Sequence, residues 1–280
     1  MTINKLKLLE KKSIEIIKSV YNFVDPENIA LLYSCGKDST VLLHLIKKSK
    51  VKLPIMIHID TNKKFKKMIQ YRNKIFSNLN CDNIVIESNY SSDNKAECCQ
   101  YNKVSPLNDI IYNLNNFDRF TVINNKKIPI QQNTTIQALF VGIRRDEEKS
   151  RCKEEYISKR YKNSWDIESS ELQINNFYSF DINDEVHLRI HPLLDWTELD
   201  IWEYIKQENI DIIDLYFSKN GYRYRSLGCK CCTQKIKSNA VTVSQIIMEL
   251  KQNLSNVEER STRLQDNKNG LEQLRINGYM

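Results

Sequence analysis

The feature that most constrains the fold is a series of short apolar runs that alternate with segments of helical patterning. Residues 29–33, IALLY, are apolar without interruption, which is typical of a strand buried on both faces of a parallel sheet. Further strand-like runs stand at residues 54–59, 83–87, 138–141 and 186–190. Apolar side chains recur at helical spacing over residues 3–20, 40–48, 64–79 and 197–207. Alternating strands and helices predict an α/β fold, doubly wound, with a mostly parallel sheet.

The chain divides by pattern into a larger and a smaller part. Residues 1–207 contain every predicted strand and are expected to form the α/β domain. Residues 208–280 show no strand-like run and are expected to form a C-terminal extension that is helical or irregular. Within the first part, residues 117–135 are polar and are predicted to be an inserted loop.

The net charge and the lack of long apolar runs limit the partners of the chain. Its formal net charge is +7, which favours anionic partners such as nucleotides, sulfate, phosphate or nucleic acid, although a solvated lysine-rich surface would give the same sum. No apolar run approaches the roughly 20 residues that cross a membrane, and the N-terminus has no apolar signal core. We therefore expect a cytoplasmic protein.

A short polar string, SCGKDS, follows the first predicted strand and precedes a helix. Ser34 and Ser39 supply hydroxyl donors, Lys37 supplies a positive charge, and Gly36 lets the backbone approach an anion closely. The N–H groups of a helix N-terminus add to this attraction, and Asp38 either caps the helix or helps to hold Mg²⁺. We expect this loop to bind pyrophosphate, and therefore ATP. An ordinary helix cap with a lysine nearby is the alternative.

Two further strand ends belong to the same expected site. In an open parallel sheet, ligands bind at the carboxyl ends of the strands, near the point where the strand order reverses. This rule brings the loop together with His58 and Asp60, at the end of the second predicted strand, and with Gly142, which follows the fourth. His58, Asp60 and Gly142 are therefore predicted to contact the nucleotide.

Several strings together resemble one known superfamily. SCGKDS resembles the SGGKDS signature of the PP-loop ATP pyrophosphatases, and with HIDT, GIRRDEEKSR and HPLLDWTELDIWEYI it is similar to their phosphoadenylyl-sulfate reductase and sulfate adenylyltransferase branch. GIRRDEEKSR, the pair Trp165-Asp166 and the final LEQLRINGYM are most similar to the small, catalytic subunits of heterodimeric bacterial ATP sulfurylases. The chain departs from the family at Cys35, where glycine is common, at Asn62 and in the long 117–135 segment.

The resemblance implies a chemistry as well as a fold. It implies a PP-loop ATP-binding domain over residues 1–207 that makes adenylyl sulfate from ATP and sulfate and releases pyrophosphate, the first step of sulfate assimilation and cysteine biosynthesis. Such an in-line displacement at the α-phosphorus depends mainly on positioning and charge neutralisation. The resemblance also implies Mg²⁺, and an elongation-factor-like GTPase as the partner subunit that drives this uphill step.

Sulfate is strongly hydrated and a poor nucleophile, so its site needs fixed cations. Arg144, Arg145 and Arg151 are suited to this task, because a guanidinium binds oxyanions in a bidentate manner. Together with Lys37 they are the predicted catalytic residues. The alternative is that the three arginines form salt bridges with the acidic residues 146–148.

The eight cysteines include two close pairs. Cys98-Cys99 and the pair Cys229 and Cys232 form a CC…CxxC pattern that suits soft metals, because cytoplasmic thiols stay reduced. Their strings, ECCQYNKVSPL and GCKCCT, are similar to the cluster motifs of iron–sulfur adenylyl-sulfate reductases. The prediction is a [4Fe–4S] cluster on these four cysteines, with Zn²⁺ as the alternative.

An iron–sulfur reductase is one of three rival functions. It needs a nucleophilic thiol in a C-terminal segment, and no cysteine follows Cys232. A sulfur-insertion enzyme acting on nucleic acid would fit the positive charge but not the sulfurylase-like strings, so nucleic acid is not an expected partner. A non-catalytic binding subunit disagrees with the intact loop at residues 34–39.

Overall fold

The computed structural model describes residues 2–79, 81–130, 135–147, 151–152, 154–161, 186–252, 259–260 and 262–263. Two strings used for the resemblance, the pair Trp165-Asp166 and residues 271–280, lie outside the described residues. No helix in the described ranges has both the length and the apolar character needed to span a bilayer.

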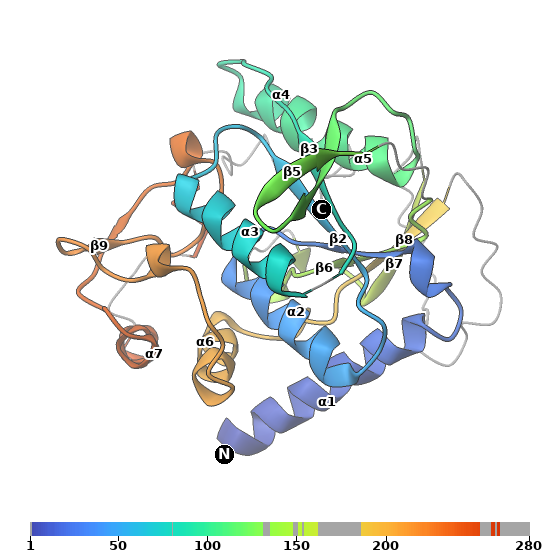
Figure 1. The fold of residues 1–280 in the computed structure, drawn as a ribbon. Helices are drawn as coiled ribbons and strands as arrows, with labels where there is room; N and C mark the ends of the chain where they lie inside the picture. The colour runs from blue at the N-terminus through green and yellow to red at the C-terminus, as the bar shows by residue number, and fades with distance from the viewer. Residues whose placement is uncertain are drawn as a thin grey trace.

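A mixed sheet of eight strands, in the order β5-β4-β3-β2-β1-β6-β8-β7, forms the centre of the described structure (Figure 1). Its five parallel strands are β3 (Asn83–Glu87), β2 (Ile55–Asp60), β1 (Ile29–Leu32), β6 (Ala138–Val141) and β8 (Val186–Ile190). These strands match the five predicted runs, so the predicted α/β fold with a mostly parallel sheet is confirmed. β2 and β8 are buried at every residue, as expected for strands covered on both faces.

Helices cover both faces of this sheet (Figure 1). The helices longer than three residues are α1 (Thr2–Val20), α2 (Lys37–Ser49), α3 (Lys66–Leu79), α4 (Lys95–Cys99), α5 (Ser105–Ile111), α6 (Glu198–Gln207), α7 (Val243–Lys251) and the π-helical turn Gln100–Val104. Side chains of α1, α2, α3 and α6 share one apolar core with Leu31 of β1 and Met56 of β2. The opposite face of the sheet, with Ala30 and Ile57, packs against α5.

The segment predicted as an inserted loop, 117–135, is largely a β-hairpin. β4 (Arg119–Ile123) and β5 (Lys126–Pro129) pair with each other and extend the sheet antiparallel to β3. Asn124 and Asn125, with φ of 49° and 63°, form the two-residue turn between them. The prediction of a loop was wrong over residues 119–129. β5 is exposed at every residue and has no apolar face, so its pattern gave no strand signal.

The C-terminal extension contains short strands that were not predicted, and it shares the main core. β9 (Tyr222–Arg223) and β10 (Ile236–Lys237) pair as a small antiparallel sheet. Outside the extension, one more strand was not predicted: β7 (Ile157–Tyr161), which pairs antiparallel with β8 in the main sheet. Tyr216, Ile246 and Ile247 of the extension lie in the same apolar core as α2. The extension is thus packed against the α/β part at the side where β1 ends.

Candidate active site

The polar string SCGKDS forms a tight turn between β1 and α2. Cys35 has a φ of 64°, in the left-handed region that glycine adopts most readily. Ser34 Oγ lies 3.1 Å from Ser39 Oγ across the turn. The N–H of Lys37 donates to the hydroxyl of Tyr216 at 2.9 Å, so a residue of the extension braces the first turn of α2.

Gly142 brings the end of β6 onto this turn. The sheet order reverses at β1, because β2 lies on one side of it and β6 on the other. This reversal is the switch point at which ligands bind in such sheets. A Cβ on Gly142 would lie 3.0 Å from Ser39 N and 3.1 Å from the Asp38 carbonyl carbon, so only glycine allows this approach without a shift of backbone. The structure therefore brings together the loop and Gly142, as predicted.

Lys37 and Arg144 share two carboxylates at the head of α2. The Lys37 ammonium contacts Glu259 and lies 3.3 Å from Asp38 Oδ2. Arg144 donates from Nε to Asp38 at 2.7 Å and from Nη2 to Glu259 at 2.5 Å. Burial opposes the charge of Glu259, but Arg144 and Lys37 hold the pKa of that carboxyl far below its ordinary value. Burial likewise opposes the charge of Lys37, but Asp38 and Glu259 raise its pKa.

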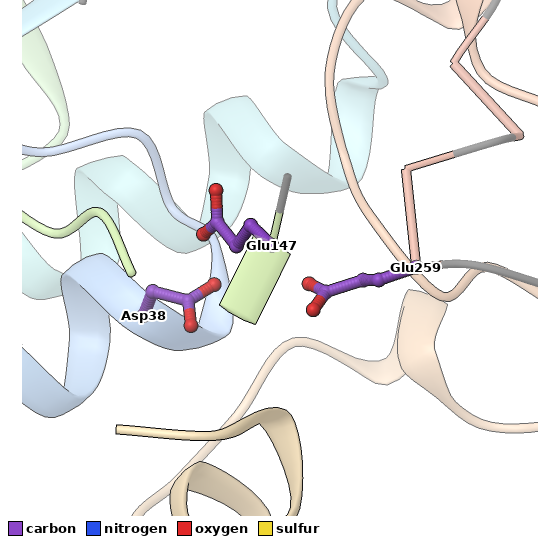
Figure 2. A group of neighbouring side chains, drawn as sticks. All are labelled: Asp38, Glu147 and Glu259. Carbon is purple, nitrogen blue, oxygen red and sulfur yellow. The ribbon is translucent and has the colours of Figure 1, made fainter. Parts of the chain in front are cut away.

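Three carboxylates converge beside the loop. Asp38, Glu147 and Glu259 each offer an oxygen within 4.8 Å of the others, and Figure 2 shows them directed toward one another. Carboxylate oxygens are ligands of the kind that Mg²⁺ prefers. Arg144 and Lys37 already neutralise two of these groups, and Arg151 contacts Glu147. The arrangement is thus a buried network of both signs.

The three predicted sulfate-binding arginines are all engaged in ion pairs. Arg144 is fully buried, and Arg151 is nearly so. Arg145 points to a different cluster, since it pairs with Asp195 and donates to the carbonyl of Glu154 at 2.7 Å. The salt-bridge alternative therefore describes these arginines in the structure, and their contact with sulfate stays a prediction.

Asp60 and His58 differ in how they face the site. Asp60 pairs with buried Arg72 at 3.0 Å and is not among the residues that line the adjacent cavity. His58 Nδ1 lies 2.7 Å from the carbonyl oxygen of Tyr33, which makes Nδ1 the protonated donor. Burial, then Lys64 and Arg72, lower the His58 pKa well below its usual range, so the ring is neutral. Its Nε2 is a buried acceptor with no partner among the described residues.

A cavity of about 130 Å³ lies at the carboxyl ends of β1 and β2. Its apolar lining comes from both strands and from α5 and the extension, and its basic lining comes from Lys64, Lys103 and Arg263. Ser34 and His58 link the cavity to the loop. The cavity thus lies between the loop and the cysteine pairs.

Lysine residues lie beside both cysteine pairs. Lys103 Nζ donates to Cys99 Sγ at 3.4 Å, because the π-helical turn after Cys99 directs this side chain back. Lys63 Nζ donates to Cys98 Sγ at 3.3 Å, and the Lys63 carbonyl accepts from the N–H of Lys230, next to Cys229, at 2.7 Å.

Positive side chains near Cys229 change the pKa of its thiol. Burial alone would raise its pKa, but the charges of Lys103, Lys64 and Arg263, with the contact to Thr61, lower it below the ordinary value. No three of the sulfurs of the CC…CxxC pattern, all four of which the structure describes, lie within 4.8 Å of one another. A tetrahedral zinc ion, with Zn–S of about 2.3 Å, would need sulfurs roughly 3.8 Å apart.

Sequence reasoning missed the contributions of the extension to this site. Tyr216, Glu259 and Arg263 lie outside every motif used above, and 179 or more residues separate Tyr216 and Glu259 from the Lys37 that they contact. Lys64 was also missed, because it stands in a lysine-rich stretch that reads as a solvated helix face. The one available signal was Lys103, which follows the cysteine pair.

Comparison with known proteins agrees with this geometry. The family model of the phosphoadenosine phosphosulfate reductase domain matches residues 28–235. A protein of Akkermansia muciniphila named sulfate adenylyltransferase subunit 2 is 34% identical over 99% of this chain and 98% of its own length. Its namesake from Psychromonas ingrahamii is 33% identical over 98% of this chain and 97% of its own length.

Solved structures share the fold at low sequence identity. The FMN adenylyltransferase of Candida glabrata superposes with a TM-score of 0.53 at 20% identity, over 83% of this chain and 64% of that chain. The phosphoadenylyl-sulfate reductase of Candida auris superposes with a TM-score of 0.51 at 17% identity, over 82% of this chain and 96% of that chain. With its fold, loop and full-length relatives in agreement, the chain belongs to the phosphoadenosine phosphosulfate reductase domain family and, within it, to the sulfate adenylyltransferase subunit 2 proteins.

Proposed function

We propose that this chain is the catalytic subunit of a sulfate adenylyltransferase, a nucleotidyltransferase that converts ATP and sulfate into adenylyl sulfate and pyrophosphate. The observation that carries the proposal is the loop at residues 34–39, placed at the switch point of the sheet and packed against Gly142. A helix N-terminus with a buried lysine suits the pyrophosphate end of ATP. The full-length similarity to relatives named sulfate adenylyltransferase subunit 2 supports the choice of sulfate as acceptor.

The proposed step is an in-line displacement. A sulfate oxygen forms a bond to the α-phosphorus while the bond from that phosphorus to the bridging oxygen breaks, and pyrophosphate leaves with the electron pair. Lys37 and the N–H groups of α2 would neutralise the charge that develops on the leaving group. Glu259 contacts both Lys37 and Arg144. The phosphates of ATP would therefore compete with this carboxylate for the same cations.

The proposed reaction also uses Mg²⁺, which would bind together with the phosphates of ATP. Asp38 and Glu147 would supply oxygen ligands, because they lie within 4.8 Å of one another and of Glu259. Lysine and arginine side chains already balance these carboxylates, which supports entry of the ion together with ATP rather than before it. When bound, the ion would neutralise charge on the phosphate oxygens.

A [4Fe–4S] cluster on Cys98, Cys99, Cys229 and Cys232 is the proposed resident metal group. The donor set fits by type, and the nearby lysines would balance the charge of thiolate ligands. A cluster binds each cysteine through a different iron and therefore accepts sulfurs that are farther apart than a single zinc ion does, and no three of these sulfurs lie within 4.8 Å of one another. It would supply structural linkage between the extension and α4.

The proposed assembly is a hetero-oligomer. The relatives carry the name subunit 2, which implies at least one other kind of subunit for those proteins. Formation of adenylyl sulfate is uphill, and the proposed partner is an elongation-factor-like GTPase that would supply energy for this step.

One assay tests the proposed function against its rivals. Purified chain with its partner subunit should release pyrophosphate from ATP only when sulfate is present, and GTP should increase that release. Thioredoxin-dependent formation of sulfite from adenylyl sulfate, without sulfate-dependent pyrophosphate release, would instead identify a reductase. Release that requires RNA or DNA would identify a sulfur-insertion enzyme.

A further inference from the structure

The cavity beside the loop is strongly basic. Lys64, Lys103 and Arg263 line it, and none of the described residues around it is an aspartate or a glutamate. The remaining lining is apolar, apart from Tyr33, Ser34 and His58. Positive charge facing a half-open, partly apolar pocket favours a small anion as its occupant.

Two of these cations lack a carboxylate partner in the described part of the chain. Lys64 forms no ion pair there, although Lys37, its counterpart in the loop, contacts Glu259 and Asp38. Within the described ranges, the acceptors of Arg263 are neutral: the Leu227 carbonyl at 2.5 Å and a serine hydroxyl at 3.2 Å. Arg263 is buried and Lys64 is half-buried, so an anionic ligand between them would be stabilised by both charges.

The backbone also holds Arg263 in place. A Cβ on Gly228 would lie 2.3 Å from Nη2 of Arg263 and 2.5 Å from its Cζ, so the guanidinium packs directly on this glycine. Gly228 is itself part of the cavity wall. The position of the guanidinium is therefore set by the peptide beside Cys229.

We propose that Lys64, Lys103 and Arg263 bind the sulfate that attacks ATP. This inference rests on the proposed function, because it names the acceptor subsite of that same reaction. A volume of about 130 Å³ accommodates one tetrahedral oxyanion with room for water, and it lies next to Ser34 of the loop. Arg144, Arg145 and Arg151, whose charges are already paired with carboxylates, are the alternative sulfate ligands.

Burial lowers the pKa of Lys64, Cys229 opposes this shift and Lys103 adds to it. A bound dianion would favour the protonated lysine. His58 Nε2, as an acceptor, would meet a hydroxyl or water rather than the anion itself.

The test compares Lys64→Met with Lys66→Met, in the chain bound to its partner subunit. Lys66 is an exposed lysine two positions away, so its substitution removes the same charge outside the cavity. We expect Lys64→Met to raise the KM for sulfate at least tenfold and the KM for ATP less than threefold, and Lys64→Arg to recover part of the loss. Lys66→Met should leave both values within twofold of those of the unmodified protein.

Direct binding separates this inference from the proposed function. Equilibrium dialysis with radiolabelled sulfate, in the presence of a non-hydrolysable ATP analogue, needs no turnover. Loss of sulfate binding in Lys64→Met, with retention in Lys66→Met, supports the subsite even if no pyrophosphate is released. Unchanged sulfate binding in a folded Lys64→Met protein overturns it. Unchanged binding together with an altered metal content would show that the cations serve the cysteines instead.

Discussion

Replacing Lys37 by methionine tests the loop most sharply, because the change removes the charge and keeps most of the side-chain volume. The Lys37 side chain is 1% exposed and contacts Glu259 and Asp38. If its ammonium meets the departing pyrophosphate, its loss should slow turnover by about 10²–10³, the usual cost of removing one such donor. The measurement is sulfate-dependent pyrophosphate release with the partner subunit present.

The same change should also affect stability, by an amount that the structure limits. Breaking a buried ion pair costs about 3–5 kcal/mol when it leaves one charge alone. Here Arg144 still donates to Glu259 at 2.5 Å and to Asp38 at 2.7 Å, so we expect a loss of about 3 kcal/mol or less. Urea unfolding measures it. The double variant Lys37→Met with Glu259→Gln should recover part of this stability, because it removes the carboxylate that has lost one of its two cations.

In the double variant, the free energy of unfolding should recover in part while the rate of pyrophosphate release should not. The double variant should stay as slow as Lys37→Met alone, since neither restores a cation at the phosphates. Lys47→Met, an exposed lysine in the last turn of the same helix, is the matched control and should keep the normal rate. A Lys37→Met enzyme within threefold of the normal rate would refute the role of the loop, as would recovery of the rate in the double variant.

Three further perturbations test other parts of the account. Gly142→Ala should slow pyrophosphate release at least tenfold, because the new Cβ would lie 3.0 Å from Ser39 N and displace the first turn of α2; a normal rate would contradict this packing. Cys99→Ser should abolish absorbance near ~400 nm in protein purified without oxygen, and a colourless unmodified protein would contradict the cluster. Burial lowers the pKa of His191 to about 4, so the unfolded chain takes up the proton first and stability falls as pH drops below about 6.5. His191→Gln should therefore reduce the stability lost between pH 6.5 and 5, measured by urea unfolding, by roughly 2 kcal/mol, and an unchanged loss would exclude this histidine as the cause.

The sequence predicted the central strands well because they obey a simple rule. A strand buried on both faces has to be apolar throughout, and IALLY at residues 29–33 and the later runs follow that pattern. The same rule could not find β5, which is exposed along its whole length and is fixed by its turn and its partner strand instead. Edge strands of this kind carry their signal in two turn residues, here Asn124 and Asn125.

Only those parts of the site whose positions are determined by neighbouring residues in the sequence could be predicted. The loop and Gly142 could be inferred because strand ends and a helix N-terminus fix their positions. The partners of Lys37 could not, since Tyr216 and Glu259 reach it through tertiary packing of the extension. The pairing of Arg144 with Asp38 and Glu259 was equally hidden, because it follows from the folded structure alone.

A crystal structure with a non-hydrolysable ATP analogue and Mg²⁺ tests the central claim most directly. We predict that the β- and γ-phosphates lie at residues 34–39, within hydrogen-bond distance of Lys37 and the first N–H groups of α2, and that Glu259 no longer pairs with that lysine. Phosphates bound elsewhere, with the Lys37–Glu259 contact intact, would contradict it.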